Sequence, residues 1–281
     1  MRPNRIALLI LSLALCNACS ETEAKTFAPQ PPAQSASSSS AALVPPCPEE
    51  MTLVDDFCID RWEAHLVVAG DPVSPHPGNH RPRHDARYLA RSAPGVKPQG
   101  YVTRFEAAEA CALAGKRLCR AREWFAACRG PRATQYPYGD ERVEGRCNTH
   151  KPHLLVKLFG RKTPLTPDAH YNNPRLHDEA GFLARTGQYE DCRNDYGVYD
   201  MVGNLHEWVA DDVSNALPKS IPLAYGNHLM GPRGNGVFMG GYFSSRGEHG
   251  KGCIYATTSH APEYHDYSIG FRCCRALASR P

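Results

Sequence analysis

Ten of the twelve cysteines in this 281-residue chain follow residue 46, and they are its most reactive side chains. A thiolate can act as a nucleophile or bind a soft metal ion, whereas paired cysteines form disulfides. Zinc sites commonly use closely spaced pairs, and these ten contain no Cys-x-x-Cys pattern. Because their number is even, we favour a disulfide framework over zinc. They are Cys47, Cys58, Cys111, Cys119, Cys128, Cys147, Cys192, Cys253, Cys273 and Cys274.

Histidines are the second group of side chains that could do chemistry. His249, His260 and His265 lie in one C-terminal region, and His206 precedes them. Three imidazoles could hold Fe(II), Cu(II) or Zn(II). Surface or hydrogen-bonded histidines are the alternative, because imidazole can both donate and accept. The sequence leaves both interpretations open.

Two short helices are expected to position part of the cysteine framework. Thr103 and Glu106 form a capping box at the start of the first helix. Gly115 is expected to end this helix in the left-handed conformation. A second helix is expected over residues 120–128, ended by Gly130. The face that the first helix buries is expected to contain Phe105, Ala108, Cys111 and Ala112.

Short strands are expected near both ends of the domain. Residues 51–54 and 57–59 form an expected hairpin, which a Cys47–Cys58 disulfide could close. Further core strands are expected at 236–240, 254–257 and 270–276. The segments between these elements, residues 70–99 and 131–197, are expected to be long loops that disulfides or bound metal hold in place.

The N-terminus is typical of an exported protein. Arg2 and Arg5 precede an apolar run over residues 6–15, which is too short to span a bilayer. Cys19 follows Ala18, a pattern that indicates a bacterial lipoprotein signal over residues 1–19 with the lipid on Cys19. We therefore expect a membrane-anchored protein of the cell envelope. Secretion with an unmodified Cys19 is the alternative.

Composition divides the rest of the chain into a tether and one domain. Residues 20–46 are rich in Ser, Ala, Pro and Gln and predict a disordered tether, which would reach about 90 Å when fully extended. Residues 47–281 are long enough for a single domain with a substantial core. Removal of Arg2 and Arg5 with the signal lowers the formal charge from +3 to +1. Because no basic block is present, nucleic acid is not an expected partner.

Six segments occur in one order between residues 107 and 274, and together they carry a family resemblance. The longest reads Y-G-V-Y-D-M-V-G-N-L-H-E-W over residues 196–208, and another begins G-G-Y-F-S-S at Gly240 and ends G-F-R-C-C at Cys274. The others are residues 107–118, 122–130, 136–140 and 147–148. They resemble the formylglycine-generating enzyme, or sulfatase-modifying factor, family. The resemblance implies a loop-rich α+β fold of the C-type-lectin-like kind, stapled by disulfides.

The resemblance also suggests how the cysteines pair. It implies the disulfides Cys111–Cys273 and Cys128–Cys253. We expect the two additional cysteines, Cys119 and Cys274, to pair with each other. Cys147–Cys192 would then clamp the long loop. In the entropic model each long-range bridge contributes about 3–5 kcal/mol.

Calcium is a further implication of the resemblance. The positions that match a calcium site of the family are Asp200, Gly203, Leu205 and Glu207. Carboxylates and carbonyls are ligands that calcium prefers. A second site would use Asn148, with Asp178 or Glu179 nearby. The alternative is that the carboxylates of the first set cap turns and pair with arginines.

The chain departs from the family at the oxidase site. Family members oxidise a substrate cysteine with two cysteines that follow the Gly-Gly and bind Cu(I). The matching positions here are Ser245 and Gly250, so copper is not expected. We therefore expect a non-oxidising pseudoenzyme, lipid-anchored or secreted, that binds a peptide, protein or glycan. The alternatives are an oxidoreductase acting on a protein or small-molecule thiol through a histidine-bound metal, and a reactive thiol at Cys253.

Overall fold

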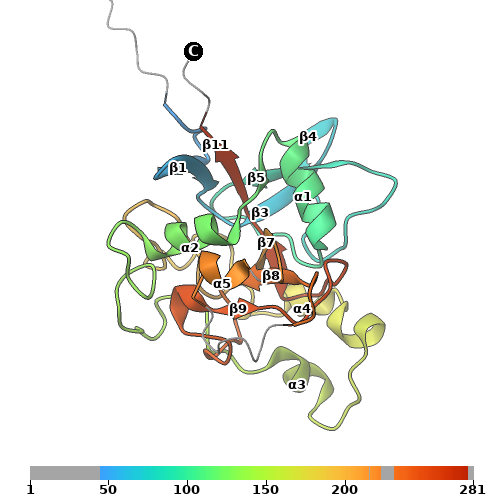
Figure 1. Cartoon of the computed structure of the whole chain (residues 1–281). Coiled ribbons are helices and arrows are strands. Elements are labelled where there is room, and N and C mark those ends of the chain that lie inside the picture. Colours follow the sequence, from blue (N-terminus) through green and yellow to red (C-terminus); the bar gives the residue numbers. More distant parts are fainter. Residues whose placement is uncertain (1–44, 215, 223–230, 278–281) are drawn as a thin grey trace, which may run out of the picture. The chain divides into compact units, whose positions relative to one another are not determined.

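A computed structural model describes residues 45–214, 216–222 and 231–277 (Figure 1). Cys16, the predicted lipidation site Cys19 and most of the expected tether lie outside these residues. Within them, strands form two four-stranded sheets and one three-stranded sheet, joined by long loops and short helices. The described helices include none that is both long and apolar enough to cross a membrane.

The first sheet joins the N-terminal hairpin to the last strand of the domain. Its order is β1-β2-β11-β6, with antiparallel pairing throughout. The expected hairpin is present, because Met51 pairs with Asp60 and a disulfide joins Cys47 to Cys58. The strands are β1 (Met51–Val54), β2 (Phe57–Asp60), β6 (Arg117–Leu118) and β11 (Cys273–Ala276).

The second sheet contains most of the C-terminal strands in the order β10-β7-β8-β9. Its strands are β7 (His206–Asp212), β8 (Gly236–Met239), β9 (Ala256–Thr257) and β10 (Ile269–Phe271). The strand expected over 270–276 is divided at Arg272, whose side chain enters the core and separates β10 from β11. The strand expected over 254–257 is shorter, since the 3-10 turn η3 (Gly252–Ile254) precedes β9.

The third sheet contradicts the long loop expected over residues 70–99. It consists of β3 (Ala64–Val68), β4 (Asp71–Pro75) and β5 (Tyr88–Ser92), with β3 in the centre. In β5 every second residue is buried, namely Tyr88, Ala90 and Ser92. This is the pattern of a half-buried strand, but the irregular residues between β4 and β5 hide it in the sequence.

Both expected helices are confirmed, as α1 (Arg104–Leu113) and α2 (Ala121–Arg129). The capping box of α1 is complete, because Glu106 N donates to Thr103 Oγ1 at 3.1 Å and Thr103 N donates to the Glu106 carboxylate at 2.8 Å. The predicted buried face of α1 was wrong in part. Phe105 is 53% exposed, and the residues that α1 buries are Ala107, Ala110 and Cys111.

The segment expected to be a loop over 131–197 contains short helices within its irregular course. They are α3 (Leu154–Phe159), the π-turn η1 (Pro167–Tyr171) and α4 (Arg175–Asp178), drawn in yellow-green and yellow in Figure 1. A further short helix, α5 (Leu217–Ser220), follows β7. The longer segment is anchored by an apolar cluster that includes Leu154, Leu155, Leu176, Phe182, Phe243 and Tyr267.

Five disulfides connect these elements, and they are the five expected pairs. The pairs are Cys47–Cys58, Cys111–Cys273, Cys119–Cys274, Cys128–Cys253 and Cys147–Cys192. Cys273 and Cys274 are adjacent in β11. Cys273 is bonded to Cys111 in α1, and Cys274 is bonded to Cys119, two residues before α2 begins. These bridges fix the backbone directly after Arg272, whose buried guanidinium is bonded to Glu207.

Candidate functional site

A Gly-Gly turn follows β8 and precedes Ser245 and Gly250, the residues predicted to stand where the family's oxidases have cysteines. Gly240 and Gly241 have φ angles of +85° and +74°, which favour glycine. A Cβ atom on Gly240 would lie 2.7 Å from the carbonyl oxygen of Met201, and one on Gly241 would lie 3.0 Å from Ser245 Oγ. Only glycines therefore allow this turn to pack so closely against Met201 and Ser245.

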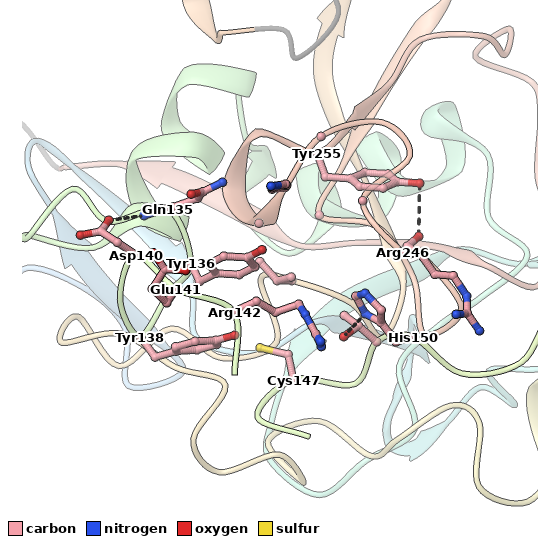
Figure 2. Close-up of a pocket in the computed structure, with 18 residues that line it drawn as sticks. Gln135, Tyr136, Tyr138, Asp140, Glu141, Arg142, Cys147, His150, Arg246 and Tyr255 are labelled. Atoms are coloured by element: carbon pink, nitrogen blue, oxygen red, sulfur yellow. Dashed lines mark hydrogen bonds between the residues drawn. The ribbon is translucent and has the colours of Figure 1, made fainter. Parts of the chain in front are cut away.

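Ser245 and Gly250 line the same pocket, which has a volume of about 230 Å³ (Figure 2). Residues 135–142 form another part of the lining, where the rings of Tyr136 and Tyr138 stack 5.6 Å apart. Figure 2 shows His150 and Arg246 across the pocket from these tyrosines. Charged residues of both signs complete the lining, namely Asp140, Glu141, Arg142, Arg246 and Lys251.

The hydroxyl of Ser245 is held in a hydrogen-bond chain that does not activate it. Ser245 Oγ accepts from Tyr242 N at 3.0 Å and donates to Tyr255 Oη at 3.2 Å, and Tyr255 donates to Glu248 at 3.0 Å. Burial raises the pKa of Tyr255, so its hydroxyl stays protonated. Nucleophilic catalysis by serine needs a base in contact with the hydroxyl, and Tyr255 cannot supply one.

The cysteines of the described residues are all bonded in disulfides. Cys147 lines the pocket but is bonded to Cys192. Cys253 is bonded to Cys128, so the hypothesis of a reactive thiol at Cys253 was wrong. A disulfide sulfur is neither a nucleophilic thiolate nor a thiolate ligand for Cu(I). The described residues that line the pocket therefore include no free thiol.

A family model for the sulfatase-modifying factor enzyme 1-like domain matches residues 48–277. The chain belongs to this family. Membership confirms the predicted fold, an α+β C-type-lectin-like body of the formylglycine-generating-enzyme kind. It also covers nearly the whole of the domain expected over 47–281.

Several known proteins are similar to this chain. The inactive C-alpha-formylglycine-generating enzyme 2 of Bos taurus is 33% identical over 120 residues, which is 42% of this chain but only 34% of the relative. The structure of PvdO from Pseudomonas aeruginosa is 20% identical with a TM-score of 0.46, covering 79% of this chain and 80% of that one. The structure of CarF is 16% identical with a TM-score of 0.42, covering 79% and 87%.

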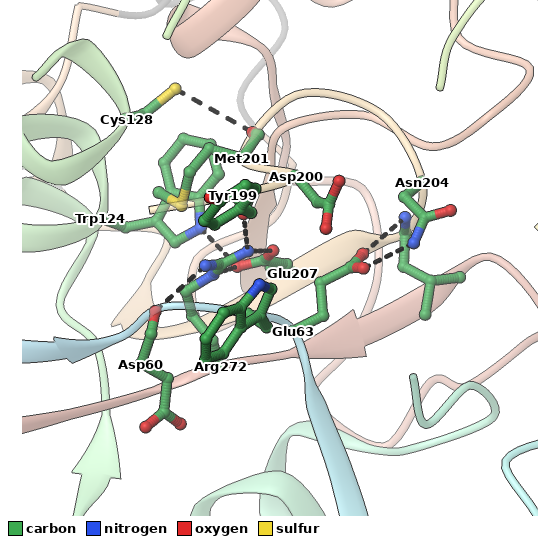
Figure 3. Close-up of polar contacts among 12 residues, drawn as sticks. Asp60, Glu63, Trp124, Cys128, Tyr199, Asp200, Met201, Asn204, Glu207 and Arg272 are labelled. Atoms are coloured by element: carbon green, nitrogen blue, oxygen red, sulfur yellow. Dashed lines mark hydrogen bonds and ion pairs between the residues drawn. The ribbon is translucent and has the colours of Figure 1, made fainter. Parts of the chain in front are cut away.

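A buried polar cluster is centred on Arg272 and includes Glu207 and Trp124 (Figure 3). The guanidinium is fully buried and donates to the two oxygens of Glu207 at 2.6 and 2.7 Å. Trp124 Nε1 donates to the same carboxylate at 2.7 Å. Arg272 also donates to the backbone carbonyls of Asp60, Arg61 and Tyr199. Arg272 was not predicted as a site residue, although it forms part of the G-F-R-C-C segment.

Two further carboxylates, Glu63 and Asp200, are buried beside this ion pair. Glu63 accepts from Asn204 Nδ2 at 2.5 Å and from Leu205 N at 3.1 Å, and Asp200 accepts from Gly187 N at 2.7 Å. Burial raises the pKa of Asp200 to about 7. The pKa of Glu63 is raised well above its usual value, mainly by burial and to a smaller extent by the negative charges of Asp200 and Glu207. If Glu63, Asp200 and Glu207 were all ionised, three negative charges would lie near the single positive charge of the buried Arg272.

This excess of negative charge fits a divalent cation at the expected calcium positions. Asp200 and Glu207 both belong to the cluster, and Gly203 and Leu205 lie in the backbone between them. Two observations oppose the fit. The Glu207 oxygens already accept from Arg272 and Trp124. In addition, these three carboxylates do not form a group of metal-ligating side chains in the described part of the chain. A calcium ion there would rely mainly on Asp200 and backbone carbonyls, sharing Glu207 with Arg272.

Asn148, the candidate for the second calcium site, packs directly against Asn204, which lies between Gly203 and Leu205 of the first candidate site. Its carbonyl accepts from Asn204 N at 2.9 Å, and its Nδ2 donates to Asn204 Oδ1 at 2.7 Å. Its Oδ1 is buried without a hydrogen-bond partner, as an oxygen ligand would be before a cation binds. The acidic candidates have other partners, since Asp178 accepts from Asn79 and Glu179 pairs with Lys157.

The structure gathers three of the four candidate histidines around one cavity. His206, His249 and His260 line it, whereas His265 hydrogen-bonds to Asn172 instead. Aromatic rings pack against these imidazoles: the Phe238 ring lies 4.8 Å from His206 and 5.7 Å from His260, between ring centres. Across residues 45–214, 216–222 and 231–277, no three His, Cys, Asp or Glu side chains are placed to hold a metal ion.

Proposed function

We propose that this domain is a non-oxidising member of its family that binds a peptide or protein segment in the Ser245 pocket. The observation that carries the proposal is a pocket of about 230 Å³ at the family's oxidase position, lined by Ser245 and Gly250 in place of the cysteine pair. A pocket that is kept while its thiols are replaced is suited to binding rather than to thiolate–copper chemistry.

The lining of the pocket favours a polar polypeptide over an apolar ligand. Arg142, Arg246 and Lys251 lie among two acidic residues and a stacked tyrosine pair. Such a mixture can pair with charged side chains and hydrogen-bond to peptide groups, while the tyrosine edges contact apolar parts. A glycan would use the tyrosines but would leave most of the charges without an ionic partner.

The test compares peptide and glycan arrays probed with the wild-type chain and two charge-reversal variants. Arg142→Glu with Arg246→Glu alters the pocket, and Arg161→Glu with Lys162→Glu is the matched control on an exposed segment outside it. We expect peptide binding to weaken at least ~10-fold in the pocket variant alone. Binding of glycans only, or equal loss in both variants, would contradict the proposal.

Activity provides a second criterion for the same proposal. The wild-type chain loaded with Cu(I) and given a cysteine peptide and oxygen should yield no formylglycine by mass spectrometry. Formation of formylglycine would overturn the non-oxidising assignment. Thiol oxidation that depends on added iron or copper would instead favour the histidine-metal oxidoreductase, because zinc is not redox active.

We propose that the mature chain is an envelope lipoprotein with a lipid anchor on Cys19, which lies outside the described residues. The sequence pattern of residues 1–19 supports this proposal. Radiolabelled fatty acid should enter the wild-type chain and Cys16→Ser, but not Cys19→Ser. Equal labelling of the two variants would contradict the anchor.

We also propose that the domain binds calcium at Asp200, with the carbonyls of Gly203 and Leu205, the shared Glu207 carboxylate, and Asn148 nearby. The ion would supply charge compensation for the buried carboxylates and no reaction chemistry. The excess of carboxylates over guanidinium and the unpaired Asn148 oxygen support this proposal.

A further inference from the structure

A second cavity, of about 160 Å³, shares the Tyr255 side chain with the Ser245 pocket but has a different chemical character. His206 at the start of β7 and Thr257 in β9 form part of its lining. Asp266 and Glu248 supply two carboxylates. The described residues that line this cavity include no lysine or arginine, in contrast to the Ser245 pocket.

Two buried side chains in this cavity have an unused hydrogen-bonding atom. His206 is 6% exposed, and its Nδ1 has no partner. Thr257 is 7% exposed, and its Oγ1 also has no partner. A neutral imidazole offers one accepting nitrogen, and a hydroxyl oxygen can accept as well. Buried polar atoms are rarely left unpaired, so both point to a bound group.

Two tyrosines of the cavity donate to its carboxylates. Tyr264 donates its hydroxyl proton to Asp266 at 2.8 Å, and Tyr255 donates its own to Glu248 at 3.0 Å. Ser268 N and Oγ also donate to Asp266, and Tyr255 Oη already accepts from Ser245 Oγ. Each tyrosine oxygen still has a lone pair to offer, and Asp266 and Glu248 are the acidic groups of the lining. A ligand that complements this lining must donate hydrogen bonds and carry positive charge.

A metal ion is a poorer complement than an organic cation. The Tyr255 ring lies 5.6 Å from His206 and 5.5 Å from His249, between ring centres, and the Phe238 ring contacts both His206 and His260. Among the described residues, no three His, Cys, Asp or Glu side chains are placed to hold a metal ion. The same rings favour an alkylammonium, because aromatic groups contact both its chain and its charge. A cavity of about 150 Å³ accommodates roughly six heavy atoms.

We propose that the cavity lined by His206, Thr257 and Asp266 binds a primary ammonium group on a short alkyl chain. A free amine and a lysine side chain share this chemistry. The ammonium donates to His206 and Thr257, and Asp266 and Glu248 balance its charge. This site goes beyond the proposed peptide binding and does not depend on it, because its polar contacts lie outside the Ser245 pocket.

The test is calorimetric titration of the full chain with n-butylammonium, using n-butanol and tetramethylammonium as comparison probes. We expect n-butylammonium to bind at least ~10-fold more tightly than either one. Butanol lacks the charge, and tetramethylammonium lacks the N–H donors. Equal binding of the three probes would overturn the proposal. Titration with Nα-acetyl-lysine methylamide then tests a lysine in a polypeptide; tighter binding than butylammonium assigns that source, and weaker binding assigns a free amine.

Variants locate the binding within the cavity. Thr257→Val removes one acceptor at nearly constant volume, and Glu248→Gln removes one charge at an exposed position. Each should weaken butylammonium binding several-fold, whereas Asp168→Asn, on the exposed η1 turn, should not. Equal affinities of all three variants, or displacement of butylammonium by Zn²⁺, would overturn the assignment. Unchanged binding in Arg142→Glu with Arg246→Glu would separate this site from the peptide pocket, and its loss there would overturn the separation.

Discussion

Replacing Arg272 with methionine is expected to lower the free energy of unfolding by about 3–5 kcal/mol. The guanidinium is fully buried and is bonded to both oxygens of Glu207. Methionine would leave that carboxylate buried, with the donor Trp124 Nε1 but without its ionic partner. Thermal unfolding should then shift down by roughly 6–20 °C, since 1 kcal/mol corresponds to about 2–4 °C in a domain of this size.

Two further variants show whether the buried charge causes the loss. Arg275→Met changes an exposed arginine in the same strand, β11, and should alter the stability by less than about 0.5 kcal/mol. Combining Arg272→Met with Glu207→Gln removes the stranded charge and should recover part of the loss. If Arg272→Met matched Arg275→Met, or the double variant recovered nothing, the ion pair would not be a major stabilising element.

The elements that were predicted from the sequence are those with local signals. The capping box of Thr103 and Glu106 lies within four residues, so the start of α1 could be placed from the sequence alone. The hairpin of β1 and β2 was equally readable, because two apolar runs flank a two-residue turn. The exposure of Phe105 could not be read, because only tertiary packing decides which face of a short helix is buried.

The polar cluster could not be predicted because its partners are far apart in the chain. Glu63 contacts Asn204 and Leu205, which lie 141 and 142 residues later. No spacing rule connects such residues, and a single Glu beside Trp62 gives no local signal. The sequence did identify Asp200 and Glu207 through the family segment. It could not show that Arg272 already occupies the Glu207 carboxylate, which changes how a cation could bind there.

Ser245 and Gly250 could be selected from the sequence, whereas the pocket that they line could not. The selection rests on their spacing from Gly240-Gly241, and their match to the family cysteines stays a prediction. The opposite wall comes from residues 135–142, more than a hundred residues earlier, and only the fold brings it near. The cavity beside His206 depends in the same way on β7, β9 and the residues before β10.

Removing calcium with EGTA at pH 7.5 is expected to lower the unfolding temperature by roughly 5–10 °C. A ligand at 100 times its dissociation constant contributes about 2.7 kcal/mol, at about 2–4 °C per kcal/mol. The same experiment in Asp200→Asn should show little effect of EGTA, because the main carboxylate ligand is gone. Asp168→Asn, at an exposed aspartate, is the matched control and should respond as the wild type does.

The pH dependence in EGTA gives an independent measure of the same carboxylate. The pKa of Asp200 is about 7 in the folded state and about 3.9 when unfolded. Above pH 4 the unfolded state therefore ionises first, and stability falls as the pH rises towards 7. His206 has the opposite sign, because its pKa of about 3 in the folded state means that stability rises between pH 3 and 6.5. The wild type alone would show these two effects nearly cancelling.

Comparison with Asp200→Asn removes this cancellation, since both proteins contain His206. Urea unfolding in EGTA gives the free energy of unfolding of both proteins. The difference between Asp200→Asn and the wild type should increase by about 3 kcal/mol in favour of the variant from pH 4.5 to 7.5. Saturating calcium should abolish most of this gain, because the ion stabilises the ionised carboxylate that burial disfavours. If the stability of both proteins changed equally with pH, Asp200 would not be the carboxylate whose ionisation burial disfavours. A gain that calcium leaves unchanged would place the cation, if bound, away from Asp200.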